Sequence, residues 1–199
     1  MRACKLEMPL RQPRDAEDLI ADVARSTSDI AARSAAALTQ VCCDIIAGEG
    51  PTVAGRVHFS RTIDAADVAL CARILGVAGR AGLSVSRAEA DALFAIDAGG
   101  SERCDEGRFD DLLAKAVMHH VMAAGGAAIP SRERALAAEH PLPAWASPIA
   151  LERELGAWLA DHLGEMKPSS PAARAINGVL RIKSVRPELP LAVLFNIAA

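Results

Sequence analysis

Apolar residues recur at helical spacing in nearly every long segment of this chain. In the stretch 30–45, for example, Ile30, Leu38, Val41 and Ile45 fall on one helix face. No segment alternates apolar and polar residues long enough to demand a strand, apart from a short extended piece around Val57–Phe59. With 199 residues, 51% of them hydrophobic, the chain can bury a large core. The pattern predicts an all-α protein, a compact multi-helix bundle with additional helices toward the C-terminus.

Capping residues and glycines predict where the helices begin and end. Pro follows Ser at two of the expected starts, where its missing N–H costs nothing. The expected helices are 15–47 with a break near 26–28 and an end at Gly48, one from Thr62 or Asp64 to Gly79, one from Ser86, one over 106–124, and others from about Ser131, Ser147 and Ser170.

We expect residues 1–199 to form a single helical domain, with an N-terminal tail over 1–14. The segment 140–148, which holds three prolines, would be the hinge if there were two domains. No apolar run approaches the ~20 residues of a membrane span, and the first residues lack the apolar core of a signal peptide. These features indicate a cytoplasmic protein with no membrane partner.

Composition excludes several function classes. Aromatic residues make up 3% of the chain and Tyr is absent, which argues against base stacking and carbohydrate binding. The five cysteines are odd in number and form no Cys-x-x-Cys pair, so we expect reduced thiols and no zinc knuckle. No Gly-x-Ser-x-Gly or phosphate-loop motif occurs, so no catalytic residue and no cofactor are predicted.

The segment 79–89, Gly-Arg-Ala-Gly-Leu-Ser-Val-Ser-Arg-Ala-Glu, has the outline of a helix–loop–helix calcium loop. When Val85 is aligned as the aliphatic residue of such a loop and Glu89 as its last ligand, the other acidic positions hold no acid. One carboxylate cannot supply the roughly six to eight oxygens of a calcium site. The pattern instead predicts a capping box, in which Ser86 and Glu89 each accept a hydrogen bond from the other's backbone amide.

The string 85–94, preceded by a helix that ends at Gly79, resembles the TerB-like family of small helical proteins. That family is named for a tellurite-resistance protein, and its helices are often joined by an Asp-Gly-x-hydrophobic-Ser-x-x-Glu turn. The resemblance implies a TerB-like helical core and a role in stress responses; some members bind metal through clustered acidic residues. Here the turn reads Ala-Gly-Leu, and only Glu89 maps onto a family position.

Chemistry-bearing side chains gather on the expected helix 106–124. Asp111, Lys115 and His119 are spaced four apart and share a face, and His120 follows directly. A carboxylate and imidazoles can act as metal ligands or as acid and base, so Asp111, His119 and His120 are the candidate metal-ligating residues. The alternative is structural, with a solvated Asp–Lys pair and with His120 as a hydrogen-bonded core histidine.

His162 lies at core spacing with Trp158 and Leu159, which favours packing over ligation. If His162 met His120 and a carboxylate across a helix interface, a bundle-type metal centre could form. The Glu-x-x-His pair of such centres is absent.

Two segments near the C-terminus bear on partners. The stretch 167–187 carries five Lys and Arg residues and no acid, but a pI near 6 and few aromatics argue against nucleic acid. The run 189–195, Leu-Pro-Leu-Ala-Val-Leu-Phe, is apolar enough to dock on the core or on a second subunit. We therefore expect a protein partner or self-association through the C-terminus.

Taken as a whole, the sequence indicates a small non-enzymatic helical protein, an interaction or stress-response module. The alternative is a metal-binding protein or an enzyme that uses Asp111, His119 and His120.

Overall fold

Three helices begin at the predicted caps Asp64, Ser86 and Ser131, whereas the next begins at Arg153, later than the expected Ser147. The structure is a computed structural model and describes residues 15–25, 29–48, 61–100, 102–127, 129–139, 152–166, 170, 172–174 and 176–177. The elements are α1 (Ala16–Ala24), α2 (Ile30–Ala47), β1 (Thr62–Asp64), α3 (Ala65–Gly79), α4 (Arg87–Gly99), β2 (Glu102–Cys104), α5 (Arg108–Ala124), α6 (Arg132–Leu136) and α7 (Arg153–Glu165). The all-α prediction is confirmed.

Local chemistry explains the helix starts. The side chain of Asp64 accepts hydrogen bonds from the amides of Ala66 and Asp67, and the Asp67 carboxylate in turn accepts one from the Asp64 N–H at 3.0 Å. Of the two expected starts of α3, Asp64 is thus the cap. Thr62 is extended instead, because β1 pairs in parallel with β2, and the sequence pattern did not reveal this short ladder.

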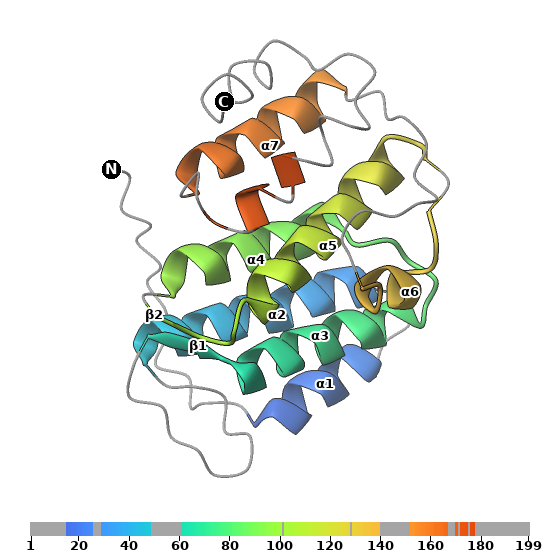
Figure 1. The fold of residues 1–199 in the computed structure, drawn as a ribbon. Coiled ribbons are helices and arrows are strands. Elements are labelled where there is room, and N and C mark those ends of the chain that lie inside the picture. Colours follow the sequence, from blue (N-terminus) through green and yellow to red (C-terminus); the bar gives the residue numbers. More distant parts are fainter. Residues whose placement is uncertain are drawn as a thin grey trace.

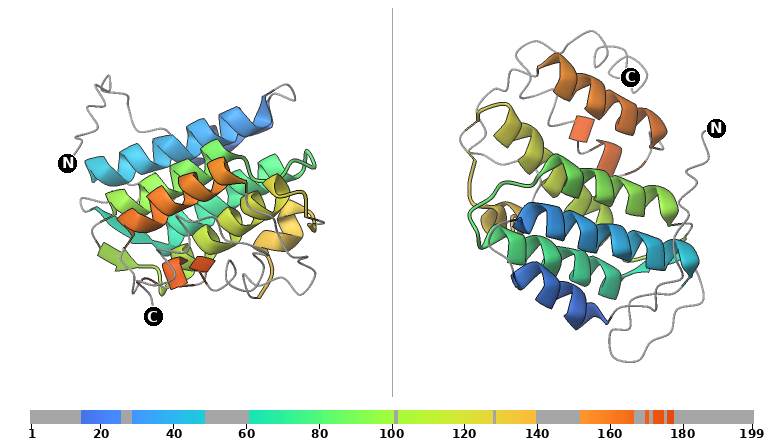
Figure 2. Two further views of the ribbon diagram at one scale, coloured as in Figure 1. Left: turned by 90° about the horizontal axis from the view of Figure 1, so that it is seen from above. Right: turned by 180° about the vertical axis from the view of Figure 1, so that it is seen from behind.

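The helices pack as a bundle around one hydrophobic core. Helix α2 packs on α4, α3 and α1; α5 packs on α4, α3 and α6. Figure 1 places α5 and α6 on the viewer's side and α2 behind α3. Seen from behind in Figure 2, helices α7, α4, α2, α3 and α1 follow one another from top to bottom. The core draws buried side chains from α1 through α5 and from α7.

Helix α2, with 18 residues, is the longest helix of the described chain and is largely apolar. By length and composition it could cross a membrane, a test that the core helix of a bundle also passes. Its buried residues include Leu38, Val41 and Ile45, and they join the same core as α3 and α4. Packing within the bundle therefore accounts for its composition.

Several sequence predictions fall outside the described residues. They are the tail 1–14, the extended piece 57–59, the hinge 140–148, the helix start at Ser147, most of the basic stretch 167–187 and the apolar run 189–195. The cap at Ser170 is confirmed, because its Oγ accepts a hydrogen bond from the Ala173 N–H at 3.0 Å.

Candidate functional site

A fully buried ion pair lies at the centre of the segment that the sequence singled out. Glu89, in the first turn of α4, faces Arg132, the first residue of α6. Arg132 donates from Nη1 to Oε1 at 2.8 Å and from Nη2 to Oε2 at 2.7 Å, and both side chains are 0% exposed. Two parallel charge-assisted bonds join the groups in a geometry that a Lys could not reproduce, while the buried Nε of Arg132 has no hydrogen-bond partner in the described part of the chain.

The pair also fastens the neighbouring backbone. Arg132 donates to the carbonyls of Leu75, at 3.2 Å, and Ser84. Glu89 accepts from the backbone N–H and the hydroxyl of Ser86, at 2.8 and 2.9 Å, which completes the predicted capping box. One buried cation therefore joins α3, the α3–α4 turn, α4 and α6.

Gly79 makes room for the arginine. A Cβ at this position would lie only 3.0 Å from Cδ of Arg132. The sequence identified Gly79 as a helix stop, and it is indeed the last residue of α3. The close approach to Arg132 is a second role, which depends on a residue far away in the chain and which no local pattern signals.

His119 is buried beside this pair and bonds the backbone on both sides. Nδ1 accepts a hydrogen bond from the Val85 N–H at 3.2 Å, so the proton of the neutral ring lies on Nε2. Nε2 donates to the Pro130 carbonyl at 3.2 Å. Burial lowers the pKa of His119 and nearby Arg132 lowers it further, which favours the neutral ring at pH 7.

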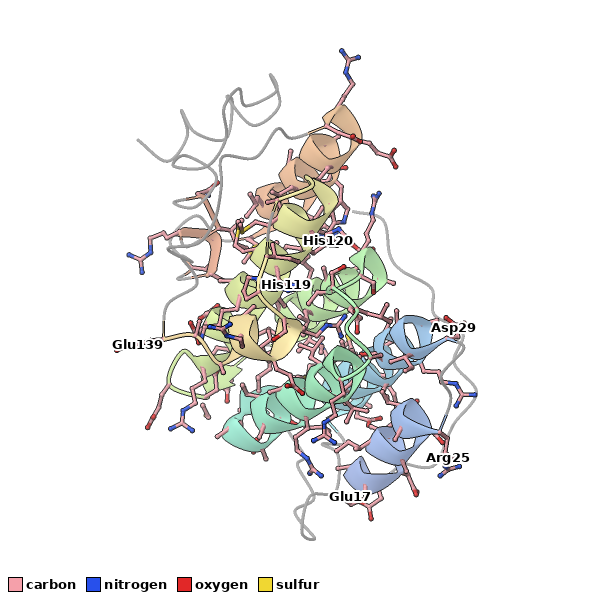
Figure 3. The ribbon with its side chains drawn as sticks, turned by 90° about the vertical axis from the view of Figure 1, so that its right-hand side faces the viewer. Glu17, Arg25, Asp29, His119, His120 and Glu139 are labelled. Carbon is pink, nitrogen blue, oxygen red and sulfur yellow. The ribbon has the colours of Figure 1, made fainter. Side chains whose placement is uncertain are left out.

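His120 forms a hydrogen bond with the carbonyl of Val85, the residue whose N–H donates to His119. Its Nδ1–H donates to the Val85 carbonyl at 2.8 Å, and its ring meets Trp158 edge-on at a centroid distance of 5.2 Å. The ring is half-buried, and burial lowers its pKa. The two consecutive histidines, labelled in Figure 3, thus hold both the N–H and the carbonyl of Val85.

The structure does not bring Asp111 to the histidines. Its carboxylate pairs with Lys115 one turn along α5, and the side chains are 44% and 8% exposed, respectively. The predicted Asp–Lys pair is therefore present, although Lys115 is buried rather than solvated. Within the described part of the chain, no three His, Cys, Asp or Glu side chains gather as they would around a metal ion.

A hollow of about 380 Å³ opens beside His119 and Arg132. Its walls come from the α3–α4 turn, the C-terminal half of α5 and the segment that leads into α6. Neither His120 nor Asp111 lines it. The lining residues are Gly82, Leu83, Ser84, His119, Ala123, Ala127, Ile129, Pro130, Ser131 and Arg132.

A second polar cluster fastens α7 to the bundle. Asp91 of α4 accepts hydrogen bonds from Nε1 of Trp158 at 2.6 Å and from Nε2 of His162 at 2.9 Å. His162 stacks on Phe94 with ring centroids 4.2 Å apart. The indole of Trp158 contacts the imidazole rings of both His162 and His120, and Asp91 bonds only His162 of the two, so the three groups do not gather as they would around a metal ion.

Three of the four described cysteines offer no activated nucleophile. Cys42 and Cys71 are buried, and burial raises the pKa of Cys42 to about 11 and raises that of Cys71 as well. The pKa of Cys43 is also raised, chiefly by burial. A reactive cysteine needs a lowered pKa, so these thiols remain protonated at pH 7.

Comparisons with protein-family models, with curated proteins and with solved structures found no match to this chain.

Proposed function

We propose that this chain is a non-enzymatic helical interaction module with a TerB-like core, acting in a stress response. The observation that carries the proposal is the use made of its polar side chains. Glu89, Arg132 and His119 are all buried, and their hydrogen bonds go to one another, to the Ser86 hydroxyl or to the protein's own backbone. Side chains held in this way stabilise the fold that presents the protein's surface, and they need no chemical reactivity to do so.

The chemistry of the neighbouring groups supports the same proposal. A general base or a metal ligand needs a free lone pair within reach of its target. Nδ1 of His119 accepts from Val85 and its Nε2–H donates to Pro130, so this ring has no free lone pair. Burial raises the pKa of Cys42, which argues against a thiolate nucleophile at that position.

The proposed partner is a second copy of this chain, bound through the apolar run 189–195. We expect the full chain to be a dimer by light scattering coupled to gel filtration, and a chain ending at residue 188 to be a monomer. A matched variant, Leu191→Asp with Leu194→Asp, keeps the length of the segment and removes its apolar character. It should also be monomeric. A truncated chain that remains dimeric would contradict this mode of association.

Elemental analysis of the purified full chain tests the non-enzymatic, metal-free part of the proposal. We expect no stoichiometric transition metal. Stoichiometric metal that is lost in both His119→Ala and His120→Ala would overturn the proposal and favour a metal protein instead. Both variants should first be checked for a cooperative thermal transition, because each histidine also holds Val85.

A further inference from the structure

His119 connects two walls of the hollow. Its Nδ1 holds the α3–α4 turn at Val85, next to the lining residues 82–84. Its Nε2 holds the opposite wall at Pro130. The ring is 2% exposed and itself lines the hollow. Both contacts hold only while one nitrogen accepts a hydrogen bond and the other donates one.

We infer that His119 is a pH-sensitive latch, whose protonation releases the α3–α4 turn and opens the hollow. A protonated imidazole donates from both nitrogens and accepts at neither. The bond to the Pro130 carbonyl therefore survives protonation, whereas the bond from the Val85 N–H is lost. Two N–H groups would then face each other in a buried position, and the turn must move to separate them.

The adjacent histidine is a built-in control. His120 donates from Nδ1 to the Val85 carbonyl, and a protonated ring still carries that proton. Protonation of His120 therefore leaves its contact with Val85 in place. The two neighbours differ in this respect, although both hold the same residue and both are at least half-buried.

The charges around His119 oppose its protonation in the closed state. The guanidinium of Arg132 on α6 and the ring of His120 lower its pKa, the carboxylate of Glu89 on α4 raises it, and burial has the largest effect and lowers it. Because Arg132 and Glu89 pair with each other, burial remains the main cause. A proton therefore binds better after the turn has opened.

The pH dependence of opening follows from the difference between the pKa of His119 in the open and in the closed state. A histidine in the open turn titrates near 6.5, and the closed state titrates lower. Above pH 6.5 neither state binds the proton, and opening is independent of pH. Below pH 6.5 the open state gains the proton, so the opening equilibrium grows about tenfold per pH unit until the pKa of the closed state is reached.

Hydrogen exchange of the full chain between pH 7.5 and 5.5 tests the latch, with protection factors corrected for the intrinsic rate at each pH. In the native protein we expect the 82–86 amides to lose about tenfold protection per pH unit below 6.5. Amides of α2 around Leu38 should change less. The side-chain amide of His119→Gln can accept from Val85 and donate to Pro130 without titrating. In this variant the protection of the 82–86 amides should therefore stay constant below pH 6.5. His120→Gln should lose protection as the native chain does.

The inference is overturned if the native turn keeps its protection down to pH 5.5, or if α2 loses protection in parallel with the turn, which would mean global unfolding. It is also overturned if His119→Gln behaves as the native chain does. Should that variant fail to fold, the comparison of the turn with α2 in the native protein decides alone. None of these results depends on a binding partner, so the latch and the proposed dimer can fail separately.

Discussion

Glu89→Ala is expected to lower the free energy of unfolding by about 3–5 kcal/mol, because it leaves the Arg132 guanidinium charged, buried and without its carboxylate. The loss includes the capping-box bonds to Ser86. Urea unfolding at pH 7, followed by circular dichroism, measures it. Glu89→Gln keeps the shape and the acceptor for Ser86 but not the charge, so it separates the ion pair from the cap.

An exposed pair that joins α4 to α7 supplies the matched control. Arg87 and Glu154 are 3.4 Å apart, with side chains 49% and 88% exposed. Glu154→Ala should leave stability nearly unchanged, because solvent screens such pairs. If Glu89→Ala cost no more than Glu154→Ala, the Glu89–Arg132 pair would not be buried as described.

A double-mutant cycle should show strong coupling between the two buried residues. Arg132→Met alone strands the Glu89 carboxylate, and Glu89→Leu alone strands the guanidinium. The double variant strands neither charge. We expect it to be more stable than the sum of the two single losses predicts, since apolar replacements of buried ion pairs are often tolerated. Simple additivity would contradict a direct interaction.

Trp158→Ala should cost about 3–5 kcal/mol, which is typical of a large buried aromatic residue, and should loosen α7 more than the rest of the bundle. The Trp158 ring is 5% exposed and meets Phe94 edge-on, with centroids 6.0 Å apart. Its Nε1–H also supplies a bond to Asp91. Urea unfolding measures the loss in the free energy of unfolding of the whole chain. Hydrogen exchange of residues 153–165 measures the loss of protection within α7.

Two variants divide the contribution of Trp158. Trp158→Phe keeps one aromatic ring but removes the N–H and part of the indole volume, so its loss of stability should be smaller than that of Trp158→Ala. Asp91→Ala removes the acceptor shared with His162 and should lie between the two. If α7 kept its protection in Trp158→Ala while other helices lost theirs, the aromatic contacts would not be what fastens it.

The helix boundaries were predictable because their causes are local. Ser86 and Glu89 stand three residues apart, and the bonds of a capping box are made within that span. Gly48, with φ of 75°, ends α2 where the sequence placed the end. In contrast, the strand pair β1–β2 was missed, since three-residue strands carry no periodic signal and each needs a partner about 40 residues away.

The candidate site was predictable only in part. Spacing correctly put Asp111, Lys115 and His119 along one side of α5, but it could not say how deeply each is buried. Exposure falls along that side, from the Asp111 side chain at 44% to the buried His119, which bonds the carbonyl of Pro130. Three polar residues that are equally spaced in the sequence therefore differ in burial, from an exposed Asp111 to a buried His119.

The sequence by itself determined the helical class, most helix boundaries and the capping box at Glu89, since each depends on residues within one or two helical turns. Only the tertiary structure decided what the polar residues do. Arg132 stands 43 residues from Glu89, and Val85 stands 34 residues from His119. Burial turns these distant pairs into strong contacts, because an unpartnered charge or N–H is costly once water is excluded.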